Sequence, residues 1–343
     1  MTNTTRHGRD ALVAHVQTWR PYTLWYVGLL GLAGAGLTGG EHEWWALLAA
    51  WATPTIGWIG GHYLGDWFDR RLDAISKPHR PIPSGRLRPE TALGCGIACL
   101  VAVGGLTVLG GWPATLVALL AAGGIVAYSR GLKARGLAGN LIRGLLGALA
   151  LLYGALLDPG PYLWALLPFL VAIWAHDTAS NLVGTLRDVD GDRAGGYQTM
   201  PVRHGYRAAV WTATGCYALT LVAALVGGVT TPAEAVHPDG RTPYLWLLAL
   251  LAVAGSSIFV SLLARRGDLS VRTALRAHEL LVLERVGLAG SMVALGFGLA
   301  PAAVLTVAIL LVTGWSQARM RAGYELGPPG HPVITLPHLP EHS

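Results

Sequence analysis

The sequence predicts an all-α protein, a bundle of helices that cross a membrane, and three observations support this fold class. Hydrophobic residues make up 52% of the 343 residues. Charged residues make up only 13%, about half of their usual share in soluble proteins. Apolar runs recur along the chain, many near the ~20 residues that a spanning helix needs. Because these runs do not alternate with period two, they predict helices and not a membrane β-barrel.

Ten apolar runs are candidate membrane spans. They lie near residues 22–39, 44–64, 91–110, 112–128, 138–157, 161–183, 206–229, 244–264, 284–299 and 301–317. Glycine and proline mark several joints between them, as at 158–161. The last two runs are short and could form one bent helix, so the prediction is nine or ten spans.

The loop charges predict an orientation. Lys and Arg concentrate in the stretches 65–90, 129–143, 187–207 and 265–285, and the alternate loops hold few of them. Such alternation is the positive-inside pattern, which places the basic loops in the cytoplasm. It also accounts for the net charge of +6 without a nucleic-acid partner. Arg319 and Arg321, after the last run, favour ten spans over nine.

The chain is predicted to have one large domain with two flanking segments. Residues 1–20 form a cytoplasmic N-terminal segment, and residues 21–320 form the transmembrane domain. Residues 324–343 are rich in Pro and His and show no apolar period, so they are predicted to be a disordered tail.

Two clusters of aspartate carry the strongest chemical signal. Asp66, Asp69 and Asp73 follow the second run, and their spacing of three and seven places them on one helix face. Asp188 and Asp192 follow the sixth run with a spacing of four. Oxygen ligands without Cys or His suit Mg²⁺, which fills its remaining positions with water and substrate phosphate. Two such faces at one membrane depth could grip a single diphosphate through Mg²⁺.

Basic and aromatic residues near these clusters suit the oxygens of a diphosphate. Lys77, Arg80 and Arg86 follow the first cluster, and Tyr128 and Lys133 lie in the next basic loop. Each Lys or Arg could instead be a positive-inside residue with no other role.

Polar residues also lie deeper in the second and sixth runs. Asp177 and Asn181 share the predicted face of the second acidic cluster, and His62 and Trp58 share that of the first. Ionisable residues this deep in a span usually face a cavity or a partner. They predict a polar lining beneath the metal ions, in which Asp177 or His176 could orient an acceptor or take its proton. The alternative is a structural hydrogen bond between helices, such as His62 with Asp177.

These motifs together resemble those of the UbiA superfamily of intramembrane prenyltransferases. GDWFDRRLD (65–73) is similar to the first acidic motif of the family, NDxxDxxxD, and KPHRPIPSG (77–85) to its continuation. YSRGLK followed by GN (128–140) is similar to its YSxxLK…GN loop, and DVDGD (188–192) to its second acidic motif. The resemblance covers roughly residues 20–320. One position departs from the pattern: Gly65 stands where the family has Asn, which supplies a polar ligand beside the metal ions.

The resemblance implies Mg²⁺-dependent transfer of an isoprenyl group from a polyprenyl diphosphate to a hydrophobic acceptor, aromatic or lipid-like, within the membrane. The five aspartates would hold Mg²⁺, and the diphosphate would ionise to an allylic carbocation at a site that opens to the cytoplasm. Trp58, Trp67 or Tyr63 could stabilise this cation through a cation–π contact.

Two alternatives remain. One is a terpene cyclase of the same superfamily, which needs no acceptor. The other is a transporter, although acids at the cytoplasmic helix ends and not at the midplane argue against it. The sequence does not determine the oligomeric state.

Overall fold

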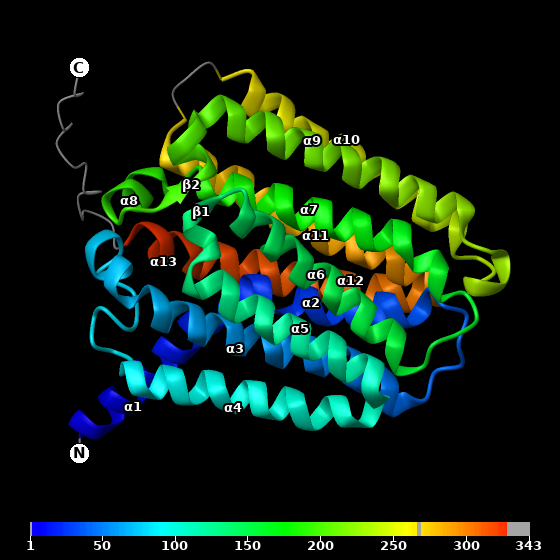
Figure 1. Cartoon of the computed structure of the whole chain (residues 1–343), viewed down its shortest axis with the longest axis horizontal. Helices are drawn as coiled ribbons and strands as arrows, with labels where there is room; N and C mark the ends of the chain where they lie inside the picture. Colours follow the sequence, from blue (N-terminus) through cyan, green and yellow to red (C-terminus); the bar gives the residue numbers. More distant parts are fainter. Residues whose placement is uncertain (1, 266–268, 328–343) are drawn as a thin grey trace.

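The computed structural model describes residues 2–265 and 269–327 and shows one bundle of long helices (Figure 1). Ten helices correspond to the ten predicted runs: α2 Pro21–Gly36, α3 Trp44–Ser76, α4 Pro89–Thr107, α5 Gly111–Arg130, α6 Ala138–Leu157, α7 Leu167–Thr185, α9 Met200–Thr230, α10 Arg241–Leu263, α11 Val271–Phe297 and α12 Leu299–Ser316. Eight helical segments are long and apolar enough to cross a membrane. Of the ten, α2 has only 16 residues and α3 carries the first acidic motif near its end.

The N-terminal helix and several short elements gather at one end of the bundle. They are the N-terminal helix α1 Thr2–Trp19, α8 Val189–Ala194, α13 Ala322–Leu326 and two strands, β1 Arg135–Gly136 and β2 Gln198–Thr199. The strands pair in parallel and tie the α5–α6 connection to the α8–α9 connection. In Figure 1 these elements lie together at one end of the bundle, where helix α1 begins and helix α13 ends. This end also carries both acidic motifs.

The helices form a buried centre and an apolar outer layer. Helices α2, α6, α7 and α11 pack closely, and glycine allows the nearest approach: a Cβ on Gly31 would overlap the backbone of Ala50, and one on Gly154 that of Gly31. Helices α4, α5, α10 and α12 are largely exposed, and most of their exposed side chains are apolar, as at Leu119 and Val253. An apolar exterior is the surface expected against lipid.

The predicted boundaries differ from the structure at the end of the chain. Helix α11 begins at Val271 and not at 284, because Glu284 and Arg285 are buried by contacts with α7 and do not lie in a loop. Gly298, with φ +86°, reverses the chain, so the last two runs form two antiparallel helices and not one bent helix.

The tail begins later than predicted. Tyr324 and Glu325 belong to α13, a helix that contacts the centre of the acidic end, so the boundary at 324 was wrong. The rest of the predicted tail, from 328 onward, lies outside the described residues.

Candidate active site

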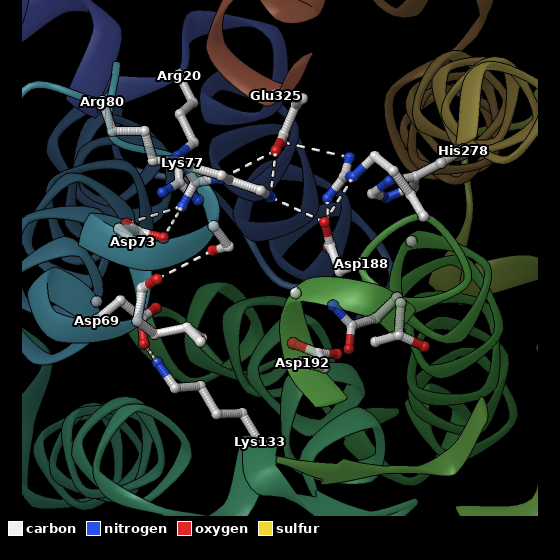
Figure 2. Close-up of a pocket in the computed structure, with 18 of the residues that line it drawn as sticks. Arg20, Asp69, Asp73, Lys77, Arg80, Lys133, Asp188, Asp192, His278 and Glu325 are labelled. Carbon is white, nitrogen blue, oxygen red and sulfur yellow. Dashed lines mark hydrogen bonds and ion pairs between the residues drawn. The ribbon is translucent and has the colours of Figure 1, made fainter. Parts of the chain in front are cut away.

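Both acidic motifs face one cavity at this end of the bundle. The cavity has a volume of about 860 Å³, and its walls come from α3, α5, α6, α7, α8, α11 and α13. Asp69 and Asp73 line it from α3, and Asp188 and Asp192 line it from the segment after α7. Figure 2 shows the two groups on opposite sides of the opening. The predicted convergence of the two motifs is therefore present in the structure.

The acids of α3 share one face because the helix runs unbroken to Ser76. Lys133, from the loop after α5, forms an ion pair with Asp69. Arg80 donates to both carboxylate oxygens of Asp73 at 3.0 Å. Burial lowers the pKa of Lys133 to about 8, because the ammonium loses its hydration. In this state the first motif is neutralised by the chain's own cations.

Asp66 lies behind the cavity wall and not on it. Arg20 forms an ion pair with this carboxylate, and the Tyr324 hydroxyl donates to it at 2.9 Å. Arg20 has φ +50°, and it alone among the described non-glycine residues has a positive φ. Backbone strain of this kind persists where surrounding contacts fix the residue, and here the turn between α1 and α2 directs the guanidinium at Asp66.

The second motif lies on a separate short helix. Helix α7 ends at Thr185, and Asp188 caps α8, with the Asp192 amide donating to its carbonyl at 2.8 Å. The expectation of one continuous helix from Asp177 to Asp188 was therefore wrong. A turn of α8 still places Asp188 and Asp192 on the same side of the cavity.

The two carboxylates of this motif have opposite environments. Burial alone would raise the pKa of Asp188, but Arg187 at 2.7 Å and Lys77 at 2.8 Å outweigh it and hold that pKa well below its usual range. Asp192 forms no ion pair within the described part of the chain, and only Thr199 donates to its side chain. Burial and the nearby charge of Asp188 raise the pKa of Asp192 to about 7. An additional cation near Asp192 would relieve this repulsion.

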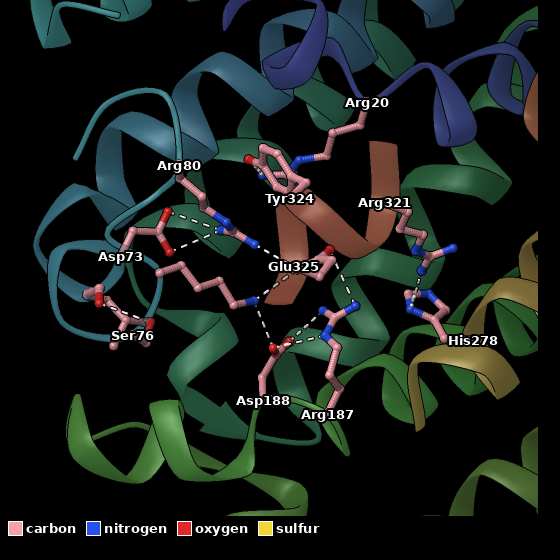
Figure 3. A network of polar contacts seen from close by, with 12 residues as sticks. Arg20, Asp73, Ser76, Arg80, Arg187, Asp188, His278, Arg321, Tyr324 and Glu325 are labelled. Carbon is pink, nitrogen blue, oxygen red and sulfur yellow. Dashed lines mark hydrogen bonds and ion pairs between the residues drawn. The ribbon is translucent and has the colours of Figure 1, made fainter. Parts of the chain in front are cut away.

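Cations from the chain join the two motifs. Lys77 Nζ donates to Asp188 at 2.8 Å and to Glu325 at 3.0 Å. Arg80, which binds Asp73, also donates to Glu325 at 2.9 Å. Figure 3 shows this continuous network, which crosses the cavity from α3 to α8 through α13. The two motifs are therefore connected through the chain's own charged side chains.

The residues fit Mg²⁺, although within the described ranges no three His, Cys, Asp or Glu side chains are grouped closely enough to form a ready-made metal cage. The acidic motifs offer carboxylate oxygens as ligands, and Mg²⁺ is commonly held by one or two carboxylates together with water and phosphate oxygens. Asp192 is a buried carboxylate that forms no ion pair with any residue in the ranges 2–265 and 269–327. Gly65 also lines the cavity, where a Cβ would meet only Ser129 Oγ, at 4.0 Å. This leaves space for a ligand or a water beside the first motif.

The deeper polar residues reach the cavity, but their partners differ from the predicted ones. Tyr128, His62, Asp177 and Asn181 all line it. His62 Nδ1 lies 2.9 Å from the carbonyl of Trp19, so the alternative hydrogen bond between His62 and Asp177 was wrong. The Asp177 carboxylate lies 3.5 Å from Arg285, and its Oδ2 is buried without a hydrogen-bond partner. Asn181 accepts a hydrogen bond from Asn140 at 2.8 Å.

Some predicted residues lie elsewhere. Arg86 donates to Gln17 at 2.6 Å and to the His79 carbonyl at 2.7 Å, and it does not line the cavity. In the structure, Arg86 therefore stabilises the loop after α3 through hydrogen bonds.

The aromatic and histidine candidates also separate. Tyr63 and Trp67 do not line the cavity. Trp58 does, but the Arg143 guanidinium already lies 3.7 Å from its ring centroid. His176 is fully buried against Glu284 and so cannot contact an acceptor in this state.

Several residues of the cavity were not predicted. Arg187 binds Asp188, Arg285 faces Asp177, and Glu325 lies at the centre of the network. Arg187 adjoins the second motif, which was a usable signal. Nothing local marks Glu325, because its partners are more than 130 residues away in sequence.

Comparison with known proteins agrees with this geometry. The model of the UbiA prenyltransferase family matches residues 24–280. The digeranylgeranylglyceryl phosphate synthase of Methanopyrus kandleri is 31% identical over 258 residues, which cover 74% of this chain and 90% of the relative. The synthase of the same name from Natronomonas pharaonis is 29% identical over 269 residues, covering 73% and 96%.

Solved structures show the same fold. A UbiA homologue from Archaeoglobus fulgidus bound to DMAPP and Mg²⁺ superposes with a TM-score of 0.63 at 14% identity, over 89% of this chain and 99% of that chain. Together these matches define the class, an integral membrane transferase of prenyl groups. The chain belongs to the UbiA prenyltransferase family. This confirms the predicted fold class and the predicted enzyme class.

Proposed function

We propose that this protein transfers an isoprenyl group from a polyprenyl diphosphate to a hydrophobic acceptor within the membrane, with Mg²⁺ bound at the two aspartate motifs. One observation carries the proposal: Lys77, which follows the first acidic motif, donates across a single cavity to Asp188 of the second motif, 111 residues later. The pattern of basic loops supports a cavity that opens to the cytoplasm.

The basic residues of the polar end suit a diphosphate. Lys77, Arg80, Lys133 and Arg187 come from three separate segments and line one cavity. Charged donors that converge in a buried site bind phosphate oxygens strongly and stabilise the charge that develops as a diphosphate leaves. Tyr128 lines the same wall and adds a hydroxyl.

Asp69, Asp73, Asp188 and Asp192 would hold Mg²⁺, and Asp66 would support the first motif from behind. Bound Mg²⁺ supplies a Lewis acid that neutralises charge on the leaving diphosphate. The chain's own cations then hold the oxygens in place while the bond from the first prenyl carbon to oxygen breaks and its electron pair stays with the diphosphate.

An apolar space below the polar end suits the isoprenyl chain. A second cavity of about 60 Å³ shares Trp58, Ile125 and Leu146 with the first and continues between α3, α5 and α6. Its remaining walls are almost entirely apolar, as at Leu100 and Val117. Water that is excluded from such a space cannot quench an allylic cation.

The acceptor that we favour is a lipid alcohol with a phosphate head group. The relatives are named for a product in which two geranylgeranyl groups are attached to glyceryl phosphate. Arg143 and Arg321 line the cavity, and neither forms an ion pair with a carboxylate of the described residues. These two guanidinium groups would bind the phosphate of the acceptor's head group. The acceptor oxygen attacks the prenyl cation, and the carboxylate of Asp177, which lines the cavity, takes the hydroxyl proton.

The test supplies purified protein in nanodiscs with Mg²⁺ and radiolabelled geranylgeranyl or farnesyl diphosphate. Each donor is offered with geranylgeranylglyceryl phosphate, with an aromatic acceptor, and alone. We expect prenylated lipid and released diphosphate only with the phosphate-bearing acceptor. A cyclic product without acceptor would indicate a terpene cyclase, and no diphosphate release from folded protein would refute the proposal.

A matched pair of variants separates the site from general charge effects. Asp192→Asn removes a buried cavity carboxylate without an ion-pair partner among the described residues. Asp190→Asn removes a carboxylate of the same short helix that also lines the cavity, but its side chain is 64% exposed and forms an ion pair with Arg193. We expect a loss of at least about 100-fold in diphosphate release for Asp192→Asn, typical of the loss of a group that stabilises the transition state. Asp190→Asn should retain the activity.

A further inference from the structure

Glu325 lies at the position that an anionic substrate group needs. Its carboxylate contacts Lys77 at 3.0 Å, Arg80 at 2.9 Å and Arg187 at 3.3 Å, and its side chain is only 7% exposed. Figure 2 shows Lys77 and Figure 3 shows Arg80 and Arg187 directed at this carboxylate, from the loop after α3 and from the end of α7. We propose that Glu325 is an internal competitor of the diphosphate and that helix α13 leaves this position when substrate binds. The inference rests on the proposed function.

The charges at this position are poorly matched by a carboxylate. A carboxylate offers one negative charge and two oxygens to the three cations, whereas a diphosphate offers more of both. Arg and Lys around a buried anion are the arrangement that phosphate favours. Like charges repel strongly in a buried site, so the carboxylate of Glu325 and a diphosphate cannot share these cations. Binding of one therefore weakens binding of the other.

The attachment of α13 is compatible with such movement. The helix has five residues, contains Gly323 and is followed directly by Gly327, which has φ +84°. A π-helical turn, Gln317–Arg321, separates it from α12, and such turns occur often at functional sites.

Helix α13 is also held mainly by the groups of the cavity itself. The Tyr324 hydroxyl donates to Asp66, and the ring lies 4.9 Å from the Arg20 guanidinium and 4.5 Å from that of Arg80. Because a diphosphate would recruit Arg80 together with Lys77 and Arg187, its arrival weakens the contacts that these three cations make with the helix.

The proposal predicts that loss of the Glu325 charge strengthens diphosphate binding. The full chain in nanodiscs would be titrated with inorganic diphosphate in the presence of Mg²⁺ by calorimetry. Glu325→Gln keeps the shape of the side chain and removes its charge. We expect its Kd for diphosphate to fall by about tenfold, the effect of removing one close repulsive charge. The control Glu90→Gln removes an exposed acid at the start of α4 and should leave Kd within twofold of the wild type.

A second measurement needs no substitution. Hydrogen exchange of residues 322–327 in the wild-type chain should become faster when diphosphate and Mg²⁺ bind. An unchanged or larger Kd in Glu325→Gln, or slower exchange of α13 on binding, would overturn the inference.

The outcomes separate this inference from the proposed function. Wild-type protein that binds diphosphate and releases α13 but transfers no prenyl group would refute the function alone. Transfer by both proteins with equal diphosphate affinity would refute the role of Glu325 alone.

Discussion

Replacement of Gly65 by Asn, the residue that the family has at this position, should strengthen Mg²⁺ binding. Gly65 faces the cavity, and a Cβ there would meet only Ser129 Oγ, at 4.0 Å. A Cβ at this position therefore fits without moving its neighbours. The substitution also exchanges a helical glycine for a residue with a slightly better propensity, a gain of a few tenths of a kcal/mol.

The expected size of the effect follows from one added polar ligand. A neutral hydrogen bond or similar contact contributes about 1 kcal/mol net, which corresponds to about a fivefold change in an equilibrium constant. The midpoint for Mg²⁺ in diphosphate release by Gly65→Asn should therefore be about fivefold lower than in the wild type. The gain applies only if the amide oxygen or its bound water reaches the metal.

Two controls isolate the amide. Gly65→Ala adds helix propensity without a ligand, and Gly94→Asn adds the same residue at an exposed site in α4 where a Cβ would meet nothing within 4 Å. Thermal unfolding with and without Mg²⁺ accompanies the kinetics for all three variants. An equal shift of the Mg²⁺ midpoint in Gly65→Ala would refute the role of the amide. Loss of activity in Gly65→Asn would also refute the reasoning, because it would show that the space beside Gly65 is itself required.

Three further predictions concern the carboxylates and the loop after α3. Burial and Asp188 raise the pKa of Asp192 to about 7, so the folded state binds this proton more tightly than the unfolded chain, and stability is lost as pH rises from about 4 to about 7. Without divalent ions, Asp192→Asn should therefore be more stable than the wild type above pH 7, by up to about 4 kcal/mol in detergent unfolding. The two proteins should be equally stable near pH 4. A variant that is less stable than the wild type at pH 8 would show that burial and repulsion by Asp188 do not raise the pKa of Asp192. Arg86→Ala should weaken stability through its lost hydrogen bonds to Gln17 and the His79 carbonyl, by about 1–3 kcal/mol, while the KM for the prenyl diphosphate stays within twofold; a rise of tenfold or more would return Arg86 to the binding site. Glu284→Gln breaks the buried pair with His176 and should cost about 3–5 kcal/mol in unfolding free energy, whereas an unchanged midpoint would show that the pair carries no net stability.

The parts of the fold that depend on local sequence could be predicted. Apolar runs give the spans directly, because lipid leaves helices as the structure for such runs. The spacing of Asp66, Asp69 and Asp73 fixes their common face within one helix, so the first motif needed no tertiary information. The second motif was also found, although α7 ends before it and a turn of α8 restores the alignment.

The parts that depend on contacts distant in sequence could not be predicted. Arg80 and Arg86 lie six residues apart in one basic loop, and only the course of that loop decides that the first reaches Asp73 while the second reaches Gln17. Arg285 was assigned to a loop by its charge, yet it lies inside the bundle opposite Asp177. Glu325 has no apolar period around it, and its partners lie in the chain near residues 77–80 and 187.

The ion pairs also balance the negative charge of the two acidic motifs. Each acid of α3 has a basic partner, and Asp188 has two, from Lys77 and Arg187. Pairing repays part of the cost of removing these charges from water. The same cations are available to a diphosphate once other cations neutralise the acids.

The most direct test of the central claim is a crystal structure of the full chain with Mn²⁺ in place of Mg²⁺ and a non-hydrolysable prenyl diphosphate. Anomalous scattering locates Mn²⁺ independently of the protein atoms. Our account predicts metal peaks within coordination distance of acids from both motifs, Asp69 or Asp73 on one side and Asp188 or Asp192 on the other, with the diphosphate between them. Peaks beside one motif alone, or a diphosphate bound outside the cavity, would contradict it.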